Sequence, residues 1–127
     1  MNRYEIVCAM IIDAFNNCSS YNICPKLASG YYMRLLSARR ECGICTEMFF
    51  IIVIISTLDS IVVEYRLESQ DPKCISFPTG HPWIGSTFTG YVEDPEFTND
   101  LVSSFLQYLA DLKNIGYIVE NINVSGN

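Results

Sequence analysis

The sequence predicts an α+β domain of two layers, in which an antiparallel β-sheet carries an N-terminal and a C-terminal helix on one face. Two dense β-branched runs within residues 48–66 are separated by a short polar segment, which is typical of an antiparallel hairpin. Amphipathic helical patterns precede and follow these runs instead of alternating with them, which favours α+β over a parallel α/β sheet. A last strand pattern closes the chain.

The central hairpin is predicted to form the core of the protein rather than a membrane span. A spanning helix needs about 18 or more nearly uninterrupted apolar residues. The apolar run at residues 48–55 is much shorter, and the segment that follows contains the charged residues Asp59, Glu64 and Arg66. Val, Ile and Phe suit strands that are packed on both faces, so we expect a buried hairpin and no membrane association.

The opening segment is predicted to be an amphipathic helix that ends near Asn16 and Asn17. Glu5 and Asp13 interrupt its apolar pattern, so we interpret it as a helix of the mature protein rather than a signal peptide. Its apolar residues recur at helical spacing: Tyr4, Val7, Cys8, Ile11, Ala14 and Phe15.

The second helix has clear start and stop signals. Asp94 is the predicted N-cap, Pro95 suits the first helical position, and Glu96 suits the positive end of the helix dipole. Gly116 is predicted to end the helix in a left-handed conformation. One apolar stripe, widened by Leu106 and Tyr108, consists of Phe97, Leu101, Phe105, Leu109 and Leu112, and the outward residues are Asp100, Gln107 and Asp111.

Weaker patterns complete the expected order of elements. Residues 26–29 could form one helical turn. Residues 31–38 suit either a helix or a strand, and we favour a strand, because of the aromatic residues, that leads into a turn at residues 39–45. Residues 86–92 suit an edge strand in which Gly90 allows a bulge or a close approach. The closing strand is expected at residues 117–124, with Ile118, Ile122 and Val124 on one face.

Length and charge limit the classes of function. The 127 residues fit a single domain, residues 1–127, and 14 acidic against 8 basic residues give a net charge of -6. This negative charge disfavours binding to nucleic acids and to anionic membranes, and it favours binding to a basic partner protein. The basic cluster Arg34, Arg39 and Arg40 is interpreted as a solvated face or turn. Because 50% of the residues are apolar, a homodimer or an obligate partner could cover surplus apolar surface.

The cysteines indicate a reducing compartment, and we expect the protein to be cytoplasmic. The pair Cys42 and Cys45 has the spacing of thiol–disulfide catalysts, but it precedes a strand pattern instead of opening a helix, which argues against redox catalysis. Cys18 and Cys24 could complete a zinc site with this pair. Their spacing is wider than in most such sites, so we predict free thiols, no metal and no cofactor.

Candidate functional residues lie in a proline-containing loop and at the start of the second helix. We predict a small interaction protein, such as an inhibitor, an immunity-type protein or an adaptor, without enzymatic activity. Its expected partner-binding residues combine aromatic anchors with carboxylates: His81, Trp83, Tyr91, Glu93, Asp94 and Glu96. The alternative is a small enzyme or small-molecule-binding domain that uses His81 and Cys74.

Overall fold

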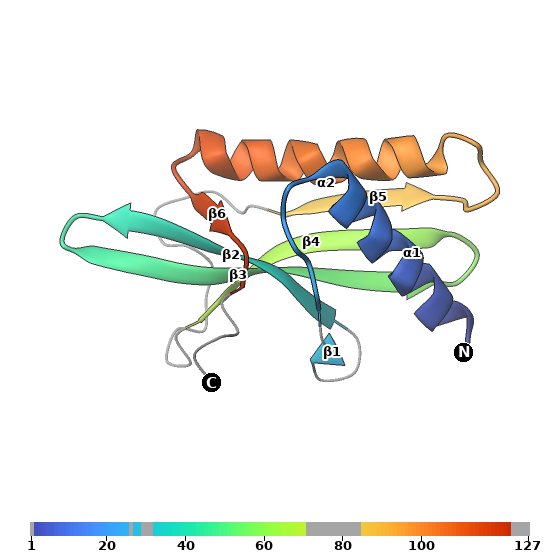
Figure 1. Cartoon of the computed structure of the whole chain (residues 1–127), viewed down its shortest axis with the longest axis horizontal. Helices are drawn as coiled ribbons and strands as arrows, with labels where there is room; N and C mark the ends of the chain where they lie inside the picture. Colours follow the sequence, from blue (N-terminus) through green and yellow to red (C-terminus); the bar gives the residue numbers. More distant parts are fainter. Residues whose placement is uncertain (1, 26, 29–31, 71–84, 123–127) are drawn as a thin grey trace.

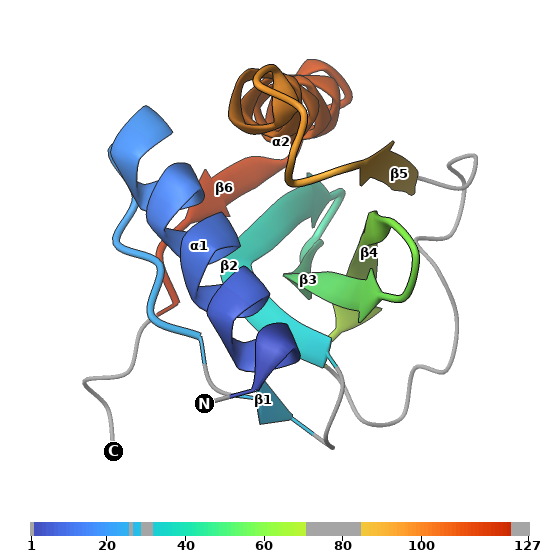
Figure 2. The same ribbon diagram turned by 90° about the vertical axis from the view of Figure 1, so that its right-hand side faces the viewer.

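The computed structural model describes residues 2–25, 27–28, 32–70 and 85–122 of the chain. Within these ranges the elements follow in the order α1 (Arg3–Cys18), β1 (Leu27–Ala28), β2 (Tyr32–Cys42), β3 (Cys45–Thr57), β4 (Ile61–Ser69), β5 (Ser86–Gly90), α2 (Phe97–Asn114) and β6 (Ile118–Glu120). The strands form one antiparallel sheet in the order β1-β2-β3-β4-β5, and β6 pairs with β2. Helices α1 and α2 lie over one face of this sheet (Figures 1 and 2), as predicted. None of the described helices is long and apolar enough to span a membrane.

The predicted central hairpin is confirmed as β3 and β4. These strands pair continuously from Phe49 opposite Ser69 to Thr57 opposite Ile61, and the turn lies at residues 58–60. The β-branched residues of both strands therefore form the centre of the sheet. Edge strand β5 is also confirmed, and it pairs with the first half of β4.

Gly90, at the end of β5, makes the predicted close approach. A Cβ atom at this position would lie 3.0 Å from side-chain atoms of both Phe88 and Phe97. Glycine thus allows the start of α2 to pack closely on the edge strand.

The predicted turn at residues 39–45 is wrong, because β2 continues to Cys42. Residues 40–42 pair directly with residues 45–47 of β3, so only Gly43 and Ile44 form the turn. Gly43 has a φ of 64°, which suits a tight two-residue hairpin loop. The predicted helical turn at residues 26–29 is also wrong, because Leu27 and Ala28 pair with β2 as strand β1.

A bulge in β2 places two consecutive leucines on the helix-covered face of the sheet, here called the inner face. The register shifts between Arg34 and Leu36, so that Arg34 lies opposite Ile52 while Leu36 lies opposite Ile51. Leu35 and Leu36 are consequently both buried. Simple alternation along the strand would have turned one of them outward.

Helix α2 begins later than predicted. Its N-cap is Glu96, and the Asp94 side chain instead accepts a hydrogen bond of 2.9 Å from the Glu96 amide within the preceding turn. The predicted stop at Gly116 is confirmed. Gly116 has a φ of 103°, its amide donates to the Lys113 carbonyl, and the Tyr117 amide donates to the Leu112 carbonyl, which is the Schellman arrangement.

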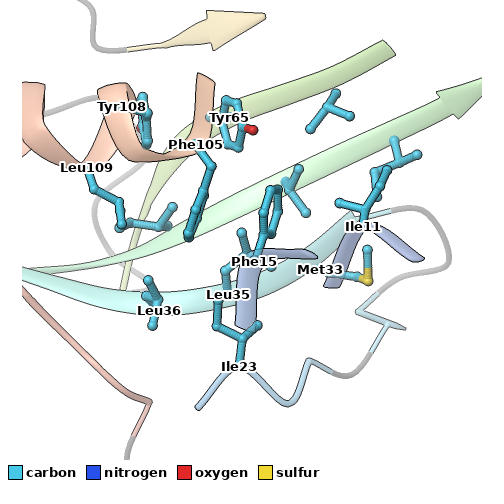
Figure 3. Close-up of a cluster of buried hydrophobic side chains, with 14 of the residues drawn as sticks. Ile11, Phe15, Ile23, Met33, Leu35, Leu36, Tyr65, Phe105, Tyr108 and Leu109 are labelled. Carbon is cyan, nitrogen blue, oxygen red and sulfur yellow. The ribbon is translucent and has the colours of Figure 1, made fainter. Parts of the chain in front are cut away.

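The apolar stripe of α2 packs against α1 and the inner face, as Figure 3 shows. Phe105 stacks on Phe15 of α1 with 4.0 Å between ring centroids, and Tyr108 stacks on Tyr65 of β4 at 5.2 Å. Burial raises the pKa of Tyr65 to about 12, although its hydrogen bond with Ser104 acts in the opposite direction. The predicted stripe is buried throughout, but Leu106 remains 41% exposed because it lies on the outward side of the helix.

The closing strand is shorter than predicted. Strand β6 spans Ile118–Glu120 and pairs with residues 37–39 of β2. Val119 and the preceding Tyr117 are buried, whereas Ile118 is 44% exposed. Alternation places Val119 inward once Tyr117 is anchored by the end of α2, and Ile118 therefore faces outward. Val124 lies outside the described residues.

Candidate functional site

The connection between β5 and α2, residues 91–96, forms a hydrogen-bonded turn. The Asp94 amide donates to the Tyr91 carbonyl at 3.0 Å, and the Phe97 amide donates to the Asp94 carbonyl at 3.0 Å. Together with the bond from the Glu96 amide to the Asp94 carboxylate, these contacts hold a compact backbone. We call this segment the acidic turn.

The acidic turn is fixed to the core at one end and exposed elsewhere. Phe97 is buried and meets Phe88 of β5 edge-on, with 5.6 Å between the ring centroids. Tyr91 is 58% exposed, and Glu93, Asp94 and Glu96 are exposed as well. The structure therefore brings together these four predicted binding residues on one anchored turn.

Charge is distributed unevenly between the sheet and the acidic turn. In β2 and β4, arginines are paired with glutamates: Arg34 with Glu68 at 3.0 Å, Arg39 with Glu120 at 2.7 Å and Arg66 with Glu64 at 2.7 Å. Across the part of the chain that the structure describes, no ion pair engages Glu93, Asp94 or Glu96. Three carboxylates that form no ion pair with another described residue are thus displayed together just before α2.

Not all of the predicted binding residues are part of the acidic turn. His81 and Trp83 lie outside the described residues, and so does Cys74 of the alternative catalytic pair. The observed candidate site consists of Tyr91 and the three carboxylates.

The predicted basic cluster does not form one solvated surface. Arg34 and Arg39 lie on the sheet face opposite the helices, here called the outer face, whereas Arg40 points inward and is only 8% exposed. Its guanidinium bonds to the Glu47 carboxylate and lies 5.6 Å from the centre of the Tyr117 ring. Burial lowers the pKa of Arg40, but the hydrogen bond and charge of Glu47, together with the nearby Tyr117 and Cys42, raise the pKa overall. The interpretation of Arg40 as a solvated residue is wrong.

The sequence contained one signal for this buried pair that was missed. Arg40 and Glu47 lie at equal distances from the turn at Gly43 and Ile44, so they face each other across the hairpin. Because opposite charges at paired positions of neighbouring strands attract, a tight turn placed at these two residues would have predicted the pair.

The cysteines do not assemble into the zinc site considered from the sequence. Cys18, Cys24, Cys42 and Cys45 are all described and free, and within the described ranges no three His, Cys, Asp or Glu side chains are grouped to hold a metal ion. Cys42 and Cys45 face each other at the end of the β2–β3 hairpin instead of opening a helix. That position lacks the helix dipole that activates the first cysteine of thiol–disulfide catalysts.

Comparison with protein-family models, with curated proteins and with solved structures gave no match to this chain.

Proposed function

We propose that this chain is a non-enzymatic interaction protein that binds a basic partner protein through the acidic turn. The observation that carries the proposal is the exposed Tyr91 beside three exposed carboxylates on a turn fixed to the core. The proposed classes are inhibitors, immunity-type proteins and adaptors, which act by binding a partner protein. A cytoplasmic location belongs to the proposal and is supported by the free thiols of the described cysteines.

The two kinds of side chain on the turn would contribute differently to a complex. A tyrosine loses little conformational entropy on burial and presents both an apolar ring and a hydroxyl, which makes it an effective anchor. Carboxylates that form no ion pair with another described residue attract a basic surface during the approach of the partner. Hydrogen bonds within the turn reduce the ordering that binding requires.

Self-association is a second part of the proposal. Several apolar side chains are exposed on α1, α2 and β6, among them Ile6, Leu106 and Ile118. A second copy of the chain could cover them, which would leave the acidic turn available to the partner protein. Sedimentation of the purified protein tests this part separately.

The alternative function, a small enzyme that uses His81 and Cys74, depends on residues outside the described ranges. It predicts a turnover that His81→Ala abolishes while fold and partner binding persist. The interaction proposal predicts no such activity.

The test begins with affinity purification of the chain from its native cell and identification of the bound protein. With the purified pair, Tyr91→Ala and Trp83→Ala should each weaken binding by about 2 kcal/mol, mainly through faster dissociation. Replacing Glu93 and Glu96 together with Gln should slow association and reduce its dependence on salt.

Asp111→Asn is the matched control, because it removes one exposed carboxylate near the opposite end of α2. If this control slows association as much as the double substitution on the acidic turn does, net charge rather than this site steers the partner. Unchanged affinity in Tyr91→Ala would refute the proposed anchor.

A further inference from the structure

The tip of the β2–β3 hairpin carries two exposed thiols on directly opposed residues. Cys42 and Cys45 are partners in the strand register, and Gly43 and Ile44 form the turn between them. The Cys45 thiol donates a hydrogen bond of 3.2 Å to the Cys42 carbonyl, so it already points across the hairpin. Figure 1 shows this tip projecting away from both helices.

The geometry of opposed strand residues suits a disulfide bond. Such residues have Cα atoms about 4.5 to 5.5 Å apart and direct their side chains to the same face of the sheet. A disulfide accepts Cα separations of about 4.4 to 6.8 Å. The strand register therefore places the two cysteines at a Cα separation of the kind that a disulfide accepts.

Two further pairs hold this register immediately behind the tip. Arg40 is bonded to Glu47, and the Thr46 hydroxyl donates a hydrogen bond of 2.8 Å to the Glu41 carboxylate. Each pair links directly opposed residues of β2 and β3. Because fraying of the hairpin would break these contacts, the thiols stay opposite each other in the folded protein.

We propose that Cys42 and Cys45 are a reversible redox modification site, which a small-molecule disulfide of the glutathione class oxidises to a bond across the hairpin tip. One protein thiolate attacks the small disulfide, forms a mixed disulfide and releases one small thiolate. The second protein thiolate then attacks the protein sulfur of the mixed disulfide and releases the second small thiolate. The two electrons, together with the two protons, pass from the protein dithiol to the two released thiols.

This modification would alter the tip rather than stabilise the fold as a whole. The bond closes a very short loop, and short loops contribute the least stabilisation through the unfolded state. Ile44, between the two cysteines, is fully exposed. Oxidation would restrict the backbone on both sides of this apolar residue. A thiol reductant would break the disulfide and remove that restriction. Disulfides of this transient kind are the ones expected in a reducing compartment.

The test is equilibration of the full chain in buffers of reduced and oxidised glutathione, followed by thiol alkylation and mass spectrometry. We expect a loss of two hydrogen atoms, mapped to a bond between Cys42 and Cys45, before any other cysteine reacts. Cys42→Ser should abolish this product completely and leave a glutathione adduct on Cys45. The matched control Cys24→Ser, which removes another exposed cysteine, should form the product as the unaltered chain does.

Three results would overturn the proposal. The first is a stable glutathione adduct on both cysteines of the unaltered chain, which would show that the thiols do not meet. The second is a first disulfide that maps to any other pair. The third is an equilibrium constant for forming the Cys42–Cys45 disulfide that is the same in native buffer and in denaturant. The hairpin register would then contribute nothing beyond the closeness of the two residues in the sequence.

Discussion

The two faces of the sheet bury apolar residues in different ways. On the inner face, Ile51 and Val53 of β3 are covered by apolar side chains of the core cluster that includes α1 and α2. On the outer face, Ile52 of the same strand is flanked by Arg34 on β2 and Arg66 on β4. It is nevertheless only 8% exposed. The inner face is a packed core, whereas on the outer face long charged side chains lie on both sides of the apolar Ile52.

The difference explains why β3 appears uniformly apolar in the sequence. Its alternate residues serve both faces, and a run of β-branched residues does not show which face receives the helices. Arginine can place its apolar stem along a neighbouring hydrophobic side chain while its guanidinium remains in an ion pair. The Arg34 guanidinium, for example, pairs with Glu68 and lies 4.6 Å from the centre of the Phe50 ring.

The largest expected effect tests the inner face. Phe105→Ala should lower the free energy of unfolding by about 3 to 5 kcal/mol, because it removes a ring stacked on Phe15 in a packed core. Leu109→Ala should cost about 2 to 5 kcal/mol. The same change at the exposed Leu106, or Gln107→Ala, should cost less than about 1 kcal/mol. Urea unfolding provides the comparison, and equal small losses in all four variants would contradict the assigned helix face.

The apolar stripe and the end of α2 were predicted correctly for a physical reason. Leu101, Phe105 and Leu109 repeat at helical spacing, and Gly116 supplies the required left-handed stop, so local rules determine the helix. The start of α2 was misplaced because the Asp94 carboxylate can bond to the backbone of a turn as well as to that of a helix. The bulge that buries both Leu35 and Leu36 depends on pairing with β3, which no local pattern reveals.

The polar contact on the inner face is expected to have an intermediate effect. Glu47→Gln keeps the shape of the side chain but removes the negative charge that compensates the nearly buried Arg40. We expect a loss of about 2 kcal/mol in unfolding free energy, below the cost of breaking a fully buried pair because the Glu47 carboxylate is partly exposed.

The matched control for Glu47 is Glu41→Gln, which changes a more exposed carboxylate of the same hairpin. We expect it to cost less than about 1 kcal/mol. If the two variants lose the same small amount of stability, Arg40 does not depend on its counter-charge, and the inner face tolerates an arginine for another reason.

The candidate site was predictable to the extent that it is local. Tyr91 and the carboxylates of the acidic turn lie next to each other in the sequence, so their common exposure follows from a polar connection before an amphipathic helix. The ion pairs that neutralise the sheet were not predicted. Arg39 and Glu120, for instance, meet only because β6 returns to pair with β2.

The smallest expected effect tests the outer face, where Arg34 combines an apolar stem with a partly exposed ion pair. Arg34→Met keeps most of the stem and removes the charge, whereas Arg34→Ala removes both. Exposed ion pairs contribute about 0.2 to 1 kcal/mol. If the stem protects Ile52 and Phe50, Arg34→Ala should lower the unfolding free energy by about 1 kcal/mol and Arg34→Met by about half as much. Urea unfolding at low and at high salt separates the two contributions, because only the charge contribution is screened. Equal losses in Arg34→Met and Arg34→Ala would show that the ion pair with Glu68, which both variants lack, rather than the apolar stem, is what Arg34 contributes to the outer face.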